Sequence, residues 1–329
     1  MNNSEIENVV IVRSKTRLEQ LTEKFNTKAQ AKFYIEQNVT NVLQKKSSKA
    51  VRKEEAEKSF NVYEEEHKSL YSTLGSVHKS LSKKIKYKEI DRTFLTSFIF
   101  TEKDLVVVIG QDGLVANTAK YVNNIPIIGV NPDPAQYDGV LLPFNTSNFE
   151  SAIEKVLSNR YQFKEVTMAE AKLSDGQRLL AFNDFYIGPT SHISARYQIS
   201  FQNLSERHSS SGIIVSTGAG STGWMSSVFN MAKSIVKNFG QTEVSANQQM
   251  PWDAKELMFV VREPFLSKTS QVQLTAGLIK SGQELTLESF MPSSGVIFSD
   301  GLETDFLQFN SGAIATIGIA SEKAKLVIL

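Results

Sequence analysis

Two glycines and an aspartate stand together in the segment Gly110-Gln111-Asp112-Gly113. It follows the apolar run DLVVVIG at 104–110, which predicts a buried strand, and precedes a helical pattern. Ligands of open α/β sheets bind at the carboxyl ends of strands, where glycines let the backbone approach a phosphate and a helix N-terminus favours negative charge. An aspartate among phosphates needs a task of its own, so Asp112 is a candidate for chemistry. The alternative is that it caps the helix.

A second glycine-rich segment, TGAGSTGW at 217–224, follows the apolar run GIIVS and precedes another helical pattern. Its letters GAGSTG fit the G-x-G-x-x-G fingerprint of dinucleotide-binding folds. That fingerprint requires a parallel βαβ unit with an acid at the end of the next strand. Here Glu243 lies in a polar segment, and the neighbouring runs are typical of antiparallel strands. The sequence therefore disfavours a hydride-transfer site at this loop.

A third candidate is the pair Asn183-Asp184, which interrupts an apolar stretch in the segment AFND at 181–184. Such a pair is common in turns and bulges, because both side chains bond to nearby backbone. It also offers an amide and a carboxylate to a polar ligand. The pair alone does not separate the two interpretations.

The elements around these loops predict an α/β protein with two domains. Continuous apolar runs alternate with helical patterns over the first part of the chain, and this order predicts a doubly wound, Rossmann-like domain with a parallel sheet at 1–150. Short alternating runs follow and predict a mainly-β domain at 151–329. The Asp-Gly pairs at 138–139, 175–176 and 300–301 suit tight turns. We expect strands at 8–13, 104–110 and 125–131, and residues 84–90 and 95–100 could complete a βα unit. Helices are expected at 15–24, within 28–83, after 113, at 148–159 and at 222–239.

The composition excludes several classes of function. The 329 residues are 41% hydrophobic and 22% charged with a net charge of +1, so nothing indicates nucleic acid or a membrane surface as a partner. The absence of cysteine excludes disulfides and thiolate chemistry and fits a cytoplasmic protein. No apolar run approaches the ~20 residues that cross a bilayer, and the N-terminus lacks the layout of a signal peptide. The four histidines, 67, 78, 192 and 208, show no metal-ligand spacing and are expected at the surface or in loops.

Taken in order, the three loops resemble the motifs of the NAD kinase family, and most closely its mitochondrial-type branch. That family carries a Gly-Gly-Asp-Gly loop, an Asn-Glu pair and a Thr-Gly-Ser-Thr-Ala-Tyr-like stretch. IIGVNPDP at 127–134, NDFYIGPTSHISARYQIS at 183–200, VREPF at 261–265 and DGLETDFLQFNSGAIATI at 300–317 are also similar to family segments. The resemblance implies a Rossmann-like ATP domain, a β-rich NAD-binding domain and a site between them.

The resemblance also implies a role for each matching residue. Asp112 would be the catalytic residue, facing the 2′-hydroxyl of the adenosine ribose of NAD and accepting its proton late in phosphoryl transfer. Mg²⁺ would arrive with ATP, or with another phosphoryl donor, without a dedicated protein cage. A homodimer or homotetramer is implied as well. The residues expected to bind the nucleotides are Gly110, Gln111, Gly113, Asn131, Asn183, Asp184, Thr217, Ala219, Thr222, Gly223 and Trp224.

The sequence departs from the family pattern at four of these positions or their neighbours. Gln111 replaces the second glycine, Leu114 replaces a threonine, and Asp184 replaces glutamate. Ser211 replaces an acid that many members carry, although the mitochondrial-type branch shares the serine. These changes leave open a non-catalytic nucleotide sensor, beside an oxidoreductase and a lipid-type kinase. The sequence indicates no role for the helical segment 28–83.

Overall fold

The computed structural model describes residues 6–43, 49–240 and 249–328 and divides into two compact units. The first unit comprises residues 1–118, 125–163 and 327–329, and the second comprises 119–124 and 164–326. The expected boundary after residue 150 falls inside helix α5 (Phe149–Leu157). The apolar side of α5 packs into the core of the first unit, so the chain leaves that unit only after the helix has ended.

Four parallel strands form the sheet of the first unit, in the order β2-β1-β3-β4. They are β1 (Asn8–Arg13), β2 (Lys86–Asp91), β3 (Asp104–Ile109) and β4 (Pro126–Val130). The predicted parallel arrangement is therefore confirmed. The residues at 95–100, which the sequence left as a possible part of a βα unit, form no strand. A short 3-10 helix at Arg92–Phe94 precedes them.

The central strands are apolar over residues 9–12 in β1 and 105–109 in β3, where both of their faces are buried. Helices α3 (Lys49–Leu81) and α5 contribute apolar side chains to one core with β1 and β3, including Leu74, Val77, Phe149 and Ile153. Helix α4 (Asp112–Ala119) starts directly after β3, and its residues 114–119 are all buried. A short buried helix at this place fixes where its N-terminus, and hence residue 112, must lie relative to the sheet.

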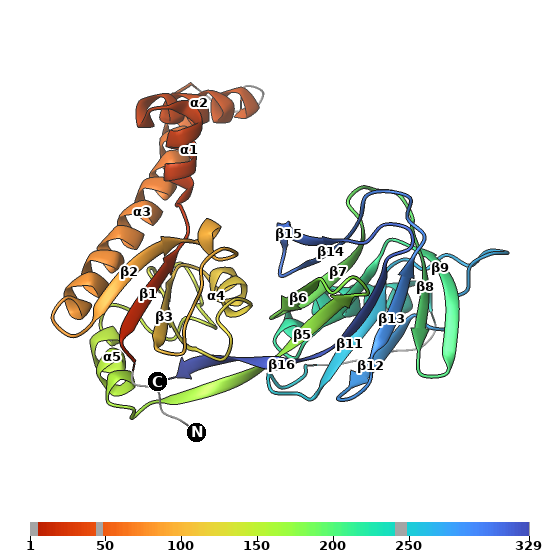
Figure 1. The fold of residues 1–329 in the computed structure, drawn as a ribbon. Coiled ribbons are helices and arrows are strands. Elements are labelled where there is room, and N and C mark those ends of the chain that lie inside the picture. The colour runs from red at the N-terminus through yellow and green to blue at the C-terminus, as the bar shows by residue number, and fades with distance from the viewer. Residues whose placement is uncertain (1–5, 44–48, 241–248, 329) are drawn as a thin grey trace. The chain divides into compact units, whose positions relative to one another are not determined.

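Three helices fill the connection between β1 and β2, which confirms the helical prediction for 28–83 (Figure 1). They are α1 (Arg17–Phe25), α2 (Lys28–Leu43) and α3. Thr16 begins α1 with a capping box, in which its hydroxyl bonds to the amide of Glu19 and the Glu19 carboxylate returns to the amide of Thr16. Leu18, Ala31 and Phe60 form a small separate core that joins the three helices.

The second unit is built from two sheets, as the alternating patterns predicted. One has the order β12-β11-β10-β7-β14-β15 and is antiparallel; the other includes β16-β13-β8-β9, with β5 on β16 and β6 on β5. The strands are β5 (Gln162–Leu173), β6 (Arg178–Ala181), β7 (Asp184–Pro189), β8 (Ala195–Phe201), β9 (Leu204–Ser210), β10 (Ile213–Ser216), β11 (Glu256–Val261), β12 (Ala276–Lys280), β13 (Leu285–Ser289), β14 (Gly295–Ser299), β15 (Leu302–Gln308) and β16 (Ile314–Ile328).

Side chains from both sheets meet in one large core. Phe185, Val215 and Phe259 come from one sheet, and Tyr197 and Leu287 from the other. The predicted helix at 222–239 is α6 (Trp224–Phe239). The predicted tight turn at 300–301 joins β14 to β15, and both its residues have positive φ, 54° and 68°, as a type I′ hairpin turn requires.

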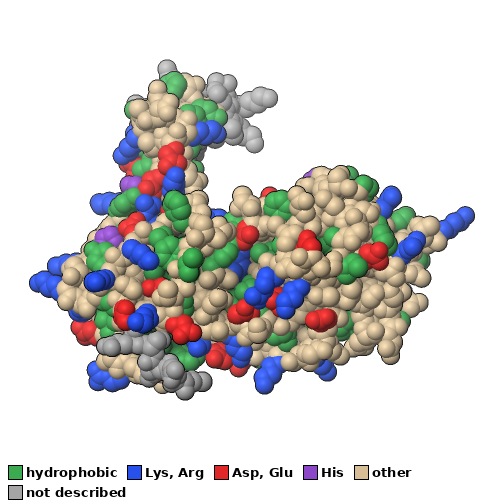
Figure 2. All heavy atoms as spheres, viewed as in Figure 1, with side chains coloured by type: hydrophobic (Ala, Val, Ile, Leu, Met, Phe, Trp, Pro, Cys, Tyr) green, Lys and Arg blue, Asp and Glu red, His purple; other side chains and the backbone are tan. Residues whose placement is uncertain are grey.

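Charges of both signs are interspersed over the face drawn in Figure 2. Among the residues that the structure describes, no helix is both long enough and apolar enough to cross a membrane.

Candidate functional site

Asp112 is the first residue of α4 and follows the carboxyl end of β3 by two residues. Its carboxylate is half-exposed, and Oδ1 accepts a hydrogen bond of 2.7 Å from the backbone amide of Leu141. That bond fixes the direction of the side chain, while Oδ2 has no hydrogen-bond partner among the described residues. A directed carboxylate with one available oxygen at a helix N-terminus is suited to orient a hydroxyl beside phosphates.

The residues around Asp112 show what the departures from the family pattern do. Gln111 is exposed, and its carbonyl accepts from the amide of Leu114, so its side chain is not used to build the loop. Leu114 is 6% exposed and lies against Gly110, where an added Cβ would come within 3.0 Å of its Cδ2. A Cβ on Gly113 would meet nothing within 4 Å. The missing hydroxyl at 114 therefore belongs to a buried packing position.

Asn131 follows β4 at the same edge of the sheet as the residues after β3. Its Nδ2 donates to the carbonyl of Tyr137 at 2.9 Å, and its Oδ1 accepts from the amide of Asp133 at 2.9 Å. Both ends of the side-chain amide thus hold the 131–137 loop. The interpretation of Asn131 as a nucleotide ligand remains a prediction.

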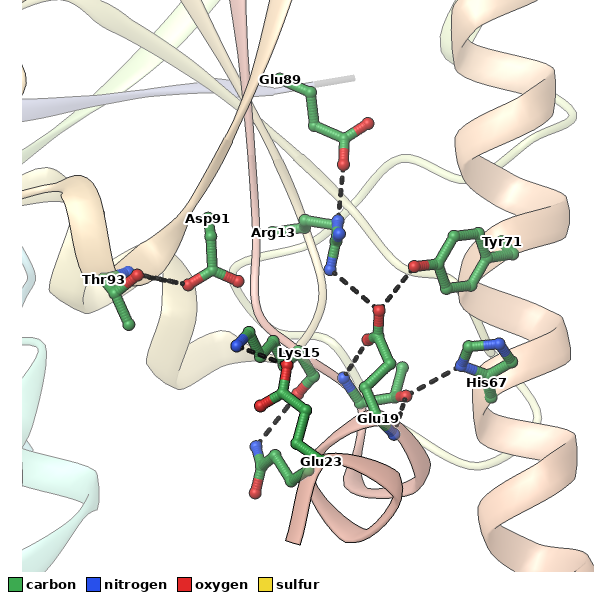
Figure 3. Close-up of polar contacts among 11 residues, drawn as sticks. Arg13, Lys15, Glu19, Glu23, His67, Tyr71, Glu89, Asp91 and Thr93 are labelled. Carbon is green, nitrogen blue, oxygen red and sulfur yellow. Dashed lines mark hydrogen bonds and ion pairs between the residues drawn. The ribbon is translucent and has the colours of Figure 1, made fainter. Parts of the chain in front are cut away.

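A polar network occupies the carboxyl ends of β1 and β2 and joins them to the helices (Figure 3). Arg13 lies between the carboxylates of Glu89, at 2.5 Å, and Glu19, at 3.5 Å. Tyr71 of α3 donates to Glu19 at 2.6 Å, and the Thr16 hydroxyl lies 2.9 Å from Nδ1 of His67. The network anchors α1 and α3 to the carboxyl ends of β1 and β2, which gives the helical segment a fixed attachment to that edge of the sheet.

In the second unit, Asn183 and Asp184 form the turn between β6 and β7. The buried carboxylate of Asp300 accepts hydrogen bonds from three successive amides of this turn, Phe182 at 3.0 Å, Asn183 at 2.6 Å and Asp184 at 3.4 Å. The amide of Asp300 donates back to the carbonyl of Asp184 at 3.0 Å. The side-chain amide of Asn183, in contrast, makes no hydrogen bond within the described residues. The turn interpretation is right for the backbone, while the Asp184 side chain is itself buried, at 7% exposure.

The loop at 217–224 holds the other side of the same turn. The Thr217 hydroxyl donates to the carbonyl of Phe182 at 2.6 Å, and the Thr217 amide donates to that of Asn183 at 2.9 Å. A Cβ on Gly220 would lie 2.1 Å from the Asn183 carbonyl oxygen, so only glycine fits there. The structure therefore brings Thr217 together with the Asn183-Asp184 pair. Ala219, Thr222, Gly223 and Trp224 are the more exposed members of the loop.

Two charged groups, Lys120 and Asp300, lie buried beside the turn, near the buried carboxyl of Asp184. The ammonium of Lys120 is 3.7 Å from Asp300 Oδ2, and both side chains are 1% exposed. Lys120 also donates to the Ser299 hydroxyl at 2.8 Å. Burial, together with the negative charge of Asp300, raises the pKa of Asp184 to about 7. Burial also raises the pKa of Asp300, against the opposing effects of Lys120 and the three amides.

Trp224 lines a cavity of about 770 Å³. Its ring stacks on Tyr186 with centroids 5.9 Å apart, and the Arg262 guanidinium lies 5.6 Å from its centre. Phe298 and Ser211 are also in the lining. Aromatic faces, a cation and hydroxyls are the groups that hold a nucleotide ring. Neither Asn183 nor Asp184 lines this cavity, so Trp224 and that pair are separate parts of the second unit.

Two residues of the site were missed from sequence. Asp300 was recognised only as part of an Asp-Gly turn, yet its carboxylate organises the 182–184 backbone. Lys120 carried no signal, because a lone lysine after a helix looks like a surface residue. The expectation for His208 was wrong. His208 lies in β9 and is 3% exposed. Its ring packs beside Tyr197, and its Nε2 lies 3.0 Å from the Glu206 carboxylate, which provides a buried polar partner.

The loop at 217–224 does not open a Rossmann unit. It follows β10, which is antiparallel to both β7 and β11, so the hydride-transfer alternative is wrong for this loop. Glu243, which bore on that alternative, lies outside the described residues. Among those that the structure describes, no three His, Asp or Glu side chains are grouped to hold a metal ion.

Comparison with known proteins identifies the first unit. Residues 9–161 match the family model described as the ATP-NAD kinase N-terminal domain. The chain is 27% identical over 223 residues to a probable NADH kinase of Oryza sativa, covering 60% of this chain and 63% of that protein. It is 32% identical over 130 residues to the NAD kinase of Chlorobium phaeobacteroides, covering 38% and 44%. The predicted resemblance to the NAD kinase family is thus confirmed as a similarity, which the family model matches over residues 9–161.

Solved structures extend the likeness of fold over nearly the whole chain. An NAD kinase from Archaeoglobus fulgidus, solved with ATP, matches with a TM-score of 0.54 at 13% identity, over 97% of this chain and 92% of that one. The yeast NADH kinase, solved with NADH, matches with a TM-score of 0.57 at 13% identity, over 99% and 84%. These matches confirm the predicted α/β-plus-β fold. By sequence, the chain spans less than two thirds of the curated relatives' length.

Proposed function

We propose that the protein is a NAD kinase, which transfers the terminal phosphoryl group of ATP to the 2′-hydroxyl of the adenosine ribose of NAD or NADH. The observation that carries the proposal is the place of Asp112. Its carboxylate starts α4 at the carboxyl end of β3, inside the domain that matches the ATP-NAD kinase family. The complexes of two proteins of similar fold, one with ATP and one with NADH, support the same pair of substrates.

In this reaction the 2′-oxygen attacks the terminal phosphorus, a new O–P bond forms, and the bond to the bridging oxygen breaks with its electron pair leaving on ADP. The hydroxyl proton passes to Asp112 and then to solvent. An aspartate is a weak base for an alcohol, so Asp112 acts chiefly by orienting the hydroxyl. Gly110 and Gly113 leave room for the triphosphate. A Mg²⁺ carried by the triphosphate would supply neutralisation of the charge on the departing ADP.

On the acceptor side, Asn183 and Asp184 hold the ribose and amide portions of the dinucleotide. The supporting observation is that other groups hold the backbone of their turn, while neither side chain makes a hydrogen bond among the described residues. Asp184 is 7% exposed, so a ligand would reach only the edge of its carboxylate. The Trp224 cavity accepts a ring of the same substrate, with Arg262 and Ser211 in its lining. Ala219, Thr222 and Gly223 belong to the same loop. Gln111 and Asn131 complete the proposed set in the first unit.

Incubation of the purified protein with NAD, ATP and Mg²⁺ tests the proposal, with NADP measured by an NADP-specific dehydrogenase. NADP should form, and Asp112→Asn should reduce its rate by about 10²- to 10⁴-fold, the usual contribution of a general base, while NAD binding stays within twofold. Parallel assays with NADH and with polyphosphate define the acceptor and the donor. NAD binding without any NADP would instead establish a nucleotide sensor.

We further expect a homodimer or homotetramer in the cytoplasm. The expectation is supported by the resemblance to the family and, for the compartment, by the absence of cysteine. Size-exclusion chromatography with light scattering measures the assembly, and a monomer at micromolar concentration would contradict it.

A further inference from the structure

The backbone of the turn at 182–184 is held by a buried charged group, the carboxylate of Asp300. Three amides point to one carboxylate, that of Asp300, and two carbonyls accept from Thr217. Asp, Asn, Ser and Thr side chains are all ordinary caps for such amides, but an aspartate is almost never fully buried unless it is paired. Here the cap is an anion at 1% exposure. An ion in that position is costly to bury, which points to a use beyond closing a turn.

A buried cation accompanies this anion. Lys120, also 1% exposed, lies 3.7 Å from Asp300 and donates to the adjacent Ser299. Its ammonium offsets part of the cost of burying Asp300. The pair is held in place by its own elements, because Ser299 ends β14 and Asp300 occupies the tight turn that follows. Strand β14 is in turn bonded to β7, the strand that begins at Asp184 (Figure 1).

We propose that Asp300 is a positioning residue for acceptor binding. Its carboxylate, with Lys120 as counter-charge, fixes the 182–184 backbone so that the side chains of Asn183 and Asp184 are presented to the dinucleotide. This inference rests on the proposed function for the identity of the ligand. It adds a residue that acts through the turn and does not touch the ligand itself.

The proposal has an electrostatic consequence as well as a geometric one. The charged groups that face Asp184 are Asp300, from the β14–β15 turn, and behind it Lys120, from the segment after α4. Burial, and after it the negative charge of Asp300, raise the pKa of Asp184 to about 7. Replacing Asp300 by a neutral residue should therefore lower that pKa.

Asp300→Asn tests the role, with NAD binding measured by titration calorimetry across pH 5.5–8.5. The dissociation constant should rise by about 10- to 100-fold, as it does when groups that hold ligating side chains are removed. KM for NAD should rise more than kcat falls, and the pH midpoint of binding should move to lower pH. The matched control is Tyr121→Phe, which removes the hydrogen bond from Tyr121 to Asp305 and leaves the 182–184 turn untouched.

Each outcome bears on one of the two proposals. Unchanged NAD affinity in a folded Asp300→Asn would overturn the positioning role and leave the kinase assignment standing. Weaker binding in Asp300→Asn, when the parent protein binds NAD but forms no NADP, would support positioning and reject the kinase. If Asp300→Asn does not fold, the double variant Lys120→Met/Asp300→Asn, which buries neither charge, decides in its place. Failure of both to fold, or equal weakening by Tyr121→Phe, would assign Asp300 to the fold alone.

Discussion

The loop at 110–113 and the turn at 182–184 each present an aspartate, and they hold it by different means. Asp112 is half-exposed at a helix N-terminus, and one amide directs its side chain. Asp184 is 7% exposed, and its backbone is fixed by the buried carboxylate of Asp300. The two proposed sites therefore differ in what fixes them. At 110–113 a partly exposed carboxylate is directed by one backbone amide. At 182–184 the backbone is held by the buried carboxylate of Asp300, whose charge is offset by Lys120.

Two glycine substitutions should separate these dependences most strongly. In Gly220→Ala the new Cβ meets the Asn183 carbonyl, so the turn must shift. We expect a loss of stability of about 1–3 kcal/mol, as for other overpacked positions, and NAD affinity at least about 100-fold weaker.

In Gly113→Ala the added Cβ meets nothing within 4 Å, so the melting temperature should stay unchanged while KM for ATP rises. Thermal melting and calorimetry measure both, and equal losses of stability would contradict the distinction.

The second expected effect is a pH dependence of NAD binding. The pKa of Asp184 lies at about 7, so its carboxylate is mostly protonated at pH 6 and mostly ionised at pH 8. If the ionised carboxylate accepts hydrogen bonds from hydroxyl groups of the ligand, NAD affinity should rise roughly tenfold from pH 6 to pH 8. The ionised fraction of a group with a pKa of 7 rises about tenfold over the same interval. Asp184→Asn should abolish the slope. A slope that persists in this variant would place the titrating group elsewhere.

A third, smaller effect should appear in stability. Because the pKa of Asp184 is higher in the folded chain than in the unfolded one, folding binds a proton between about pH 4 and 7. The contribution of Asp184 to the free energy of unfolding is therefore at its maximum below about pH 4 and is lost as the pH rises through about 7. Asp184→Asn should raise the melting temperature by several degrees at pH 8 and by little at pH 5. An equal gain at both pH values would contradict burial as the cause.

The smallest effect is expected at position 111. The Gln111 side chain is exposed and is not used to build its loop, so Gln111→Gly should fold normally. It gives phosphates more room, and kcat/KM for ATP should increase by a few-fold, about 1 kcal/mol or less by the usual conversion. A decrease, measured in the NADP assay, would mean that Gln111 itself contacts the donor.

The fold was largely predictable, because its signals are local. The runs at 8–13, 104–110 and 125–131 have continuous apolar centres, which are typical of strands buried on both faces. The loop containing Asp112 was visible because strand, glycines and helix are contiguous. Asp300 and Lys120 were not visible in this way, because their partners are distant in sequence. His208 was misjudged since a polar residue on an alternating strand gives no sign of a buried partner such as Glu206.

The first unit is discontinuous along the chain, and this has a consequence for biosynthesis. Val327, near the end of β16, is buried in the core that contains Val9 and Leu105. A ribosome must therefore translate the whole intervening second unit before that core can be completed. Until then the apolar strands β1 and β3 are exposed to chaperones and to self-association. The second unit, residues 119–124 and 164–326, is therefore fully synthesised before Val327 can join the first unit's core.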